Sequence, residues 1–183
     1  MVKYLPNMLS ALRLGAAPLA AWAILAGHDA AALVVFALAS FSDLLDGFIA
    51  RRWGVVSRFG AWLDPAADKL LMLLCFLALL KMGAAPFWLV ALVIARDALI
   101  VGGVLLARAL SLPVREAPLL LGKSSTFVQV GYVGAWLVLL SLNLESPRLM
   151  DAFAAAVAIF AILSGLAYGQ VFLRALFFGQ RTA

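Results

Sequence analysis

Long apolar runs alternate with short polar segments along the whole chain. Each run is bounded by charged residues or by Gly and Pro, and each is close to the roughly 20 residues that a helix needs to cross a bilayer. The runs lie at about residues 10–26, 30–50, 60–80, 87–107, 124–144 and 150–173. This pattern predicts an all-α integral membrane protein with six transmembrane helices.

The residues ahead of the first run also place apolar side chains at helical spacing, with Leu5, Met8, Leu9 and Leu12 as examples. This pattern suits a short N-terminal helix in the membrane interface, and it equally suits the beginning of the first span. Because no repeat, low-complexity segment or linker divides the sequence, we expect a single membrane domain over residues 1–183.

Composition supports a membrane location and excludes a nucleic-acid partner. Of the 183 residues, 66% are hydrophobic and 13% charged, and the mean hydropathy is +1.09. A soluble domain of this length has no core large enough to bury that much apolar surface. The net charge of +5 comes from bases at the ends of apolar runs, not from a continuous basic patch with exposed aromatic residues.

Lys and Arg are divided unevenly between the two sides of the predicted bundle. If the N-terminus is inside, the inner bases are Lys3, Arg13, Arg51, Arg52, Arg58, Arg108, Arg115, Lys123, Arg174 and Arg181. Only Lys81 and Arg148 are then outside. By the positive-inside rule we expect both termini and the loop at 51–59 to face the cytoplasm, in a bacterial inner (cytoplasmic) membrane.

Four carboxylates, Asp43, Asp46, Asp64 and Asp68, fall within the second and third predicted spans. Each costs roughly 3 kcal/mol in a bilayer, or on the order of 10 kcal/mol together, unless something neutralises it. Their spacings of three and four residues place each pair on one helix face. Apart from these acids and Lys69, Arg96 and Asp97, every charged residue is expected in a loop, at a span end or in a tail.

The carboxylates predict a divalent-cation site on the cytoplasmic side. Two adjacent antiparallel helices can direct all four at one point, and oxygen ligands in that number suit Mg²⁺ or Mn²⁺, as one or two ions. The alternative is a set of buried ion pairs with Arg51, Arg58 or Lys69.

Small residues lie one turn from the carboxylates, namely Gly47, Ala50 and Gly60. They leave room for a ligand beside the metal, although alone they would more often mark helix packing. Arg51 follows at the membrane surface, where a guanidinium can bind phosphate in a bidentate way. Together these residues suggest a substrate with a pyrophosphate group and an acyl tail.

The stretch matches the pattern D-x2-D-G-x2-A-R-x8-G-x3-D-x3-D at every fixed position. These positions are Asp43, Asp46, Gly47, Ala50, Arg51, Gly60, Asp64 and Asp68. The pattern resembles the signature of the CDP-alcohol phosphotransferase family. Pro6, Asn7, Leu9 and Arg13 also resemble the family's P-N-x-L-x3-R sequence before the first span.

This resemblance implies a six-helix homodimer that transfers a phosphoalcohol unit from a CDP-linked donor to a hydroxyl and releases CMP. Asp43, Asp46 and Asp64 resemble the metal ligands, and Asp68 resembles the residue that both approaches the metal and accepts the acceptor's proton. The positions that line the CDP moiety in the family correspond to Asn7, Gly47, Ala50, Arg51, Ser57 and Gly60.

Two alcohols remain candidates for the acceptor of the transferred group. LDPAADK, with Pro65 and Lys69, resembles the phosphatidylglycerophosphate and cardiolipin branches, which use CDP-diacylglycerol as donor. The stretches SDLLDGFIARRWG and IARDALIVGG look more like cardiolipin synthases, whose acceptor is phosphatidylglycerol, because glycerol 3-phosphate-using relatives tend to carry Glu at the position of Asp97. Arg96, Arg115 and Lys123 are available to bind the phosphate of either acceptor.

Two other classes of protein compete with the enzyme. A divalent cation transporter would also carry carboxylates within membrane helices, but the outer halves of these spans hold almost no polar residues to continue a path. A purely structural membrane protein leaves the cost of the carboxylates unexplained.

Overall fold

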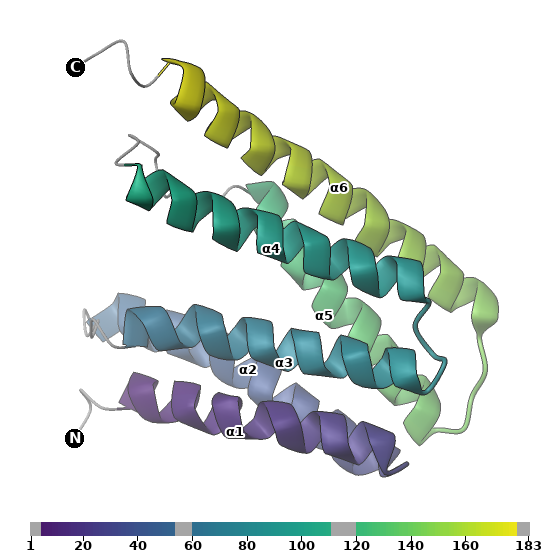
Figure 1. The fold of residues 1–183 in the computed structure, drawn as a ribbon. Helices are drawn as coiled ribbons and strands as arrows, with labels where there is room; N and C mark the ends of the chain where they lie inside the picture. The colour runs from purple at the N-terminus through teal and green to yellow at the C-terminus, as the bar shows by residue number, and fades with distance from the viewer. Residues whose placement is uncertain (1–4, 54–59, 111–119, 179–183) are drawn as a thin grey trace. The chain divides into compact units, whose positions relative to one another are not determined.

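The computed structural model describes residues 5–53, 60–110 and 120–178, and the side-chain surroundings of residues 11–42, 65–110 and 120–177. Within these ranges the regular structure is entirely helical (Figure 1). The six helices are α1 (Leu5–Leu25), α2 (Asp29–Trp53), α3 (Gly60–Lys81), α4 (Phe87–Ala109), α5 (Leu120–Ser141) and α6 (Pro147–Phe178).

Each predicted apolar run is confirmed as a helix, but several boundaries differ. α1 is continuous from Leu5, so the short N-terminal helix expected in the interface is not a separate element and that prediction was wrong. α6 has 32 residues and extends past the predicted run of 150–173 at both ends. Pro147 suits its first turn, because a proline there lacks only an N–H that would be unpaired anyway.

Three helices end in the same way, with a residue in the left-handed region. Gly27, Gly83 and Asn143 have φ values of 73°, 75° and 52°. In each case the next residue's N–H donates to the carbonyl five residues back, as from His28 to Ala23 and from Leu144 to Leu139, both at 2.9 Å. This arrangement satisfies carbonyls at the helix end and reverses the chain within a few residues.

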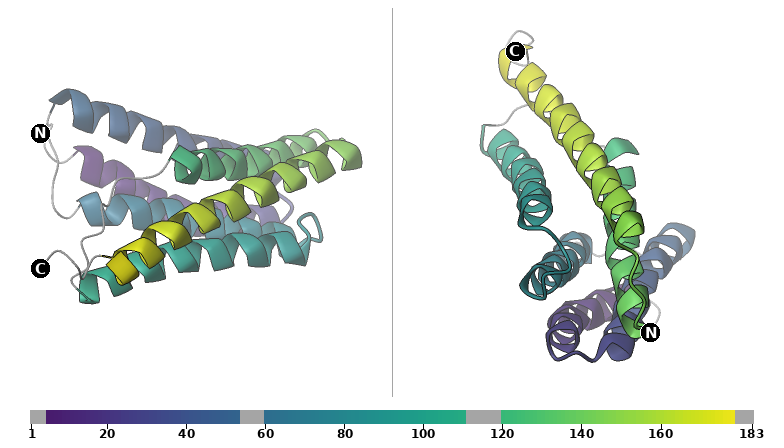
Figure 2. Two further views of the ribbon diagram at one scale, coloured as in Figure 1. Left: turned by 90° about the horizontal axis from the view of Figure 1, so that it is seen from above. Right: turned by 90° about the vertical axis from the view of Figure 1, so that its right-hand side faces the viewer.

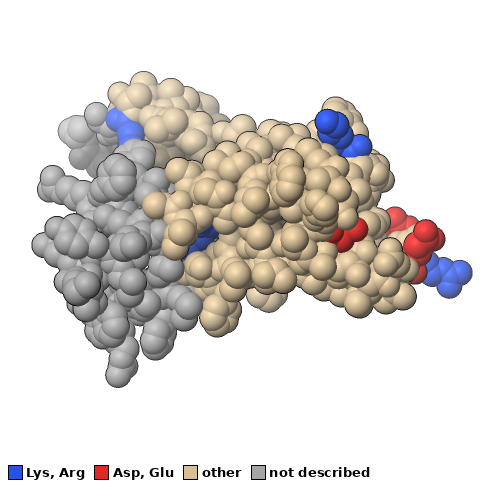
Figure 3. Space-filling model, turned by 90° about the horizontal axis from the view of Figure 1, so that it is seen from below, with Lys and Arg blue, Asp and Glu red and all other residues tan. Residues whose placement is uncertain are grey.

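Much of the protein's outer surface is apolar. By length and composition alone, three helices in the described residues can cross a membrane: α4, α5 and residues 147–177 of α6, with mean hydropathies of 2.3, 1.3 and 2.1. On the face drawn in Figure 3, charged side chains occupy only a small part of the described surface. These features indicate a membrane protein, because lipid is the solvent that suits such a surface.

The helices group into two compact units. The first comprises residues 1–86 and 133–147, and in it α1 packs along both α2 and α3, which have few direct contacts with one another in the described residues (Figures 1 and 2). Its core includes the fully buried Ala17, Ala20 and Ile24 of α1 with Phe76 and Leu79 of α3. α1 is therefore a common packing partner of the two helices that carry the carboxylate motif.

The second unit comprises residues 87–132 and 148–183. It contains α4, α6 and the first half of α5. Among the described residues its interior holds four buried polar side chains, Arg96, Ser125, Gln129 and Ser164. This polar interior distinguishes it from the first unit, where Arg13 alone among the described side chains is both buried and polar.

We predict that Leu79→Ala lowers the free energy of unfolding by about 2–4 kcal/mol, because a fully buried leucine leaves a cavity when truncated. Leu77 lies on the same helix and is 40% exposed, whereas Leu79 is fully buried, so Leu77→Ala is the matched control. Unfolding in mixed detergent micelles measures both. Equal losses for the two variants would contradict the packing described for α3.

Candidate active site

The carboxylate motif lies on two helices, as its spacing predicts. Asp43 and Asp46 belong to α2, and Asp64 and Asp68 belong to α3. α-Helical geometry thus puts each pair about one turn apart on one face. The loop between the two helices contains Ser57, which lies outside the described residues.

Most of the predicted site residues have side chains outside the part of the chain whose surroundings the structure describes. Gly47, Ala50 and Arg51 follow the first carboxylates on α2, Gly60 begins α3, and Asn7 is in the first turn of α1. Their side chains, like those of Asp43, Asp46 and Asp64, are not among those described. Arg115 lies outside the described residues altogether.

Asp68 is the one motif carboxylate whose surroundings are described. It is half-buried and directly follows Ala67, which is fully buried in the core of the first unit. Its neighbour Lys69 is also half-buried. Asp68 therefore lies at the edge of the helix packing, where a carboxylate can be both held by the protein and reached by a ligand.

The donor set fits a hard divalent ion. Carboxylate oxygens are the ligands that Mg²⁺ and Mn²⁺ prefer, and no His or Cys occurs between Asp43 and Asp68 to favour zinc. Among the described side chains, no group of three His, Cys, Asp or Glu residues lies together. The prediction that Asp43, Asp46, Asp64 and Asp68 together hold a metal ion concerns side chains that, apart from Asp68, lie outside this part of the chain.

Arg13 was expected near a span end on the inner side, and the structure adds that its side chain is buried within the helix packing. The residue lies within α1 with only 1% of its side chain exposed, and its Nε donates a hydrogen bond of 3.2 Å to the backbone carbonyl of Ala39 on α2. A sequence signal was present, since Arg13 is the last position of the P-N-x-L-x3-R pattern, but the pattern does not reveal its partner.

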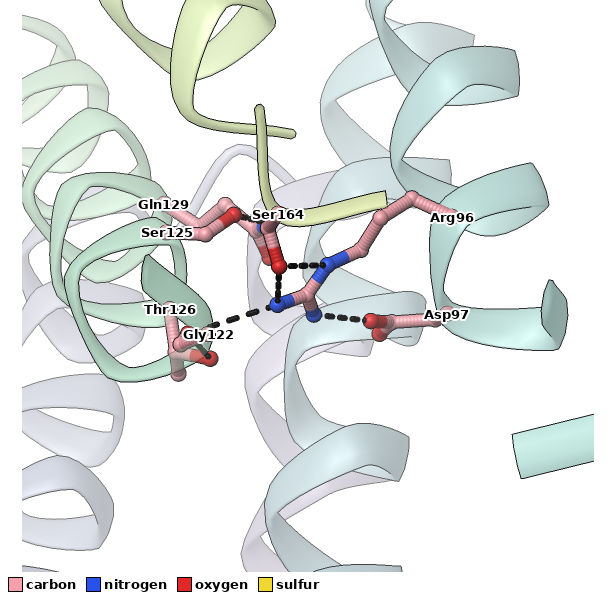
Figure 4. Close-up of polar contacts among 7 residues, drawn as sticks. All are labelled: Arg96, Asp97, Gly122, Ser125, Thr126, Gln129 and Ser164. Carbon is pink, nitrogen blue, oxygen red and sulfur yellow. Dashed lines mark hydrogen bonds and ion pairs between the residues drawn. The ribbon is translucent and has the colours of Figure 1, made fainter. Parts of the chain in front are cut away.

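Arg96 forms the centre of a polar cluster in the second unit (Figure 4). Its side chain comes from α4, and 7% of the residue is exposed. Nε and Nη2 both donate to Ser164 Oγ on α6, at 3.2 and 2.7 Å. Nη2 also donates to the carbonyl of Gly122 on α5 at 3.3 Å, and Nη1 forms an ion pair with Asp97.

These bonds link three helices through one guanidinium. Ser125 and Gln129 lie beside the cluster on α5 (Figure 4), where Gln129 Nε2 donates to Ser125 Oγ at 3.2 Å. A Cβ at Gly122 would lie 2.9 Å from the hydroxyl oxygen of Tyr168, so a larger residue there would require the Tyr168 side chain to shift. The sequence suggested neither this close approach nor the role of Ser164.

Lys123, the other described candidate for the acceptor phosphate, follows Gly122 directly and is exposed. Thus Arg96 holds the first turn of α5 through its bond to the Gly122 carbonyl, while the Lys123 side chain on the same turn is exposed. Direct contact between Arg96 and an acceptor stays a prediction. Its bond to the Gly122 carbonyl favours an effect of Arg96 on acceptor binding that is exerted by holding the first turn of α5.

These apolar helices, two of which carry the carboxylate motif, indicate a membrane protein. Residues 3–173 match the sequence model of the CDP-alcohol phosphatidyltransferase family. The chain belongs to this family, as the carboxylate motif predicts.

Relatives in the family include cardiolipin synthases and probable phosphatidylglycerophosphate synthases. The chain is 35% identical over 159 residues to the cardiolipin synthase (CMP-forming) of Rattus norvegicus, covering 78% of this chain and 50% of the relative. It is 40% identical over 129 residues to the cardiolipin synthase (CMP-forming) of Streptomyces coelicolor, covering 67% of this chain and 60% of the relative. It is 33% identical over 171 residues to a probable phosphatidylglycerophosphate synthase of Mycobacterium tuberculosis, covering 90% of this chain and 79% of the relative. The chain spans about half the length of several of the cardiolipin synthases it matches.

We predict that Ser164→Ala destabilises the protein by about 1–3 kcal/mol, because it leaves donors of a buried guanidinium without their acceptor. Ser141→Ala is the control, since the Ser141 hydroxyl bonds only to the Val138 carbonyl of its own helix. Thermal unfolding in detergent compares the two. A loss no larger for Ser164→Ala than for Ser141→Ala would show that the cluster does not stabilise the fold.

Proposed function

We propose that this protein is a CDP-diacylglycerol-dependent phosphatidyltransferase of phospholipid synthesis. The observation that carries the proposal is the complete motif from Asp43 to Asp68, placed on two helices within a chain that matches the family over residues 3–173. The acceptor hydroxyl attacks the β-phosphorus of CDP-diacylglycerol. The bond from that phosphorus to the oxygen bridging the two phosphates breaks, and CMP leaves with the bridging oxygen.

In this proposal all six helices span a bacterial inner membrane, and the protein works as a homodimer. Both termini and the loop at 51–59 face the cytoplasm. The support is the distribution of bases, ten on one side and two on the other, which follows the positive-inside rule. The cytoplasmic ends of α2 and α3 then place the carboxylates where a nucleotide can reach them from water and an acyl chain can remain in lipid.

Asp43, Asp46, Asp64 and Asp68 would hold the divalent metal, as two Mg²⁺ or Mn²⁺ ions. When bound, the ions supply positive charge that neutralises the pyrophosphate and the departing CMP. Asp68 receives the proton of the acceptor hydroxyl. Its position at the edge of the core, half-buried, suits a base that must meet a substrate arriving from outside the helix packing.

The remaining motif residues bind and orient the CDP moiety. Gly47 and Ala50 leave space beside α2 for the nucleotide, and Gly60 does so at the beginning of α3. Arg51 binds phosphate through its planar guanidinium, while Ser57 and Asn7 offer hydrogen bonds. Such contacts contribute mainly by alignment, which phosphoryl transfer requires together with charge stabilisation.

We infer that the acceptor is phosphatidylglycerol, so that the product is cardiolipin. Asp97 and its flanking sequence support this assignment, and relatives named cardiolipin synthase agree with it. Glycerol 3-phosphate is the second candidate, because the relative that aligns with 90% of this chain is named as a probable phosphatidylglycerophosphate synthase. Arg115 and Lys123 bind the phosphate of either acceptor, and Arg96 supports the turn that carries Lys123.

The acceptor is tested by incubating the purified full chain with CDP-diacylglycerol, Mn²⁺ and one acceptor at a time. We expect CMP release with phosphatidylglycerol and formation of cardiolipin, measured by mass spectrometry of the lipids. Phosphatidylglycerophosphate formed from glycerol 3-phosphate would establish the second candidate instead. Movement of Mn²⁺ across protein-containing vesicles, without CMP from any acceptor, would support a cation transporter and overturn the proposed function.

We predict that Asp68→Asn lowers the rate of transfer by at least 100-fold while retaining CDP binding, because the amide keeps the shape of the side chain and cannot accept the proton. The control is Asp151→Asn, since Asp151 is exposed at the beginning of α6. CMP release gives the rate, and retention on a CDP resin gives binding. Near-normal turnover by the Asp68 variant would show that Asp68 is not the base.

A further inference from the structure

Arg13 lies on the buried face of α1, near the start of its described part. This face continues through Ala17, Ala20 and Ile24, all of them fully buried, at spacings of four, three and four residues. The three apolar positions pack the helix, as such a face normally does. Arg13 is the exception, since it places a permanent positive charge where the rest of the face is apolar.

The hydrogen bond of Arg13 reaches the turn of α2 that leads into the motif. Its Nε donates to the carbonyl of Ala39, and Ala39 is itself 4% exposed. In an α-helix the carbonyl of residue 39 also accepts the N–H of residue 43. One oxygen atom is therefore shared between the guanidinium of Arg13 and the backbone of Asp43.

α1 also packs against the helix that carries the other two motif carboxylates. It packs along α3, which carries Asp68, as well as along α2, while the described residues of α2 and α3 have few direct contacts. The two carboxylate-bearing helices thus have α1 as a common packing partner. A polar bond that fixes the register of α1 against α2 consequently also fixes Asp43 with respect to Asp68.

We propose that Arg13 is a positioning residue for the carboxylate site, holding the α2 turn that begins at Ala39 so that Asp43 and Asp46 meet the carboxylates of α3. This inference rests on the proposed function of those carboxylates. Arg13 acts through α2 and not by touching substrate, because its side chain is almost completely buried and bonded to the backbone. Residues that orient metal ligands in this indirect way typically change metal affinity 10- to 100-fold when they are replaced.

The test is Mn²⁺ binding to the full chain in nanodiscs, followed by electron paramagnetic resonance without substrate. Arg13→Lys keeps the charge and most of the length but cannot reproduce the guanidinium bond. We expect it to raise the Mn²⁺ concentration for half-saturation at least tenfold, and we expect excess Mn²⁺ to restore most of the CMP release. Arg13→Gln, which is neutral, should show the same shift or a larger one, and it decides the question if the lysine variant does not fold.

Ile24→Ala is the matched control, because Ile24 lies on the same buried face three turns away and makes no polar bond there in the described structure. It should lower the melting temperature and leave Mn²⁺ half-saturation within twofold of wild type. Folded Arg13 variants with unchanged Mn²⁺ half-saturation, or with a shift matched by Ile24→Ala, would overturn the proposal.

The same measurements separate this proposal from the proposed function. A wild type that binds Mn²⁺ but releases no CMP with any acceptor overturns only the phosphatidyltransferase activity, and the Arg13 variants still test positioning through Mn²⁺ binding. A wild type that does not bind Mn²⁺ overturns both.

Discussion

Two arginine side chains are buried in the part of this largely apolar helical protein that the structure describes, and a guanidinium cannot lose its proton to relieve the cost. Each must therefore find oxygen acceptors on neighbouring helices, and the packing of its unit follows from where those acceptors lie. Arg13 bonds to a backbone carbonyl of α2, and Arg96 bonds to Ser164, Gly122 and Asp97. The need to compensate these charges gives an apolar helical structure a defined register, which apolar packing alone specifies less sharply.

The helices were predictable because a bilayer-length apolar run has few other structures open to it. Their ends were less predictable. Gly27 and Gly83 are typical helix-ending residues, but Asn143 lies in the left-handed region without being glycine, and α5 stops before the predicted end at residue 144. α1 is continuous from Leu5, and no Gly or Pro lies between Pro6 and Gly15 to separate its beginning from its apolar continuation.

The candidate site was predictable to the extent that it depends on spacing along one helix. Asp43 with Asp46 and Asp64 with Asp68 follow from helical periodicity, and so does their placement on α2 and α3. What links different helices was not predictable, because the sequence contains no distance between Arg13 and Ala39 or between Arg96 and Ser164. Both contacts join residues far apart in the chain, 26 and 68 positions respectively, and they exist only once the helices have packed.

The alanines on the buried face of α1 have a consequence for how the chain can vary. Ala17 and Ala20 are fully buried where α1 packs against its neighbours, so the thickness of a methyl group helps to set how closely those helices approach. The side chains of α1 therefore help to set how far α2 and α3, the two acidic helices, each lie from α1. Enlarging a single methyl on α1 would move a neighbouring helix without altering any acid, and in the proposed function it would change the space left for the ion and the headgroup.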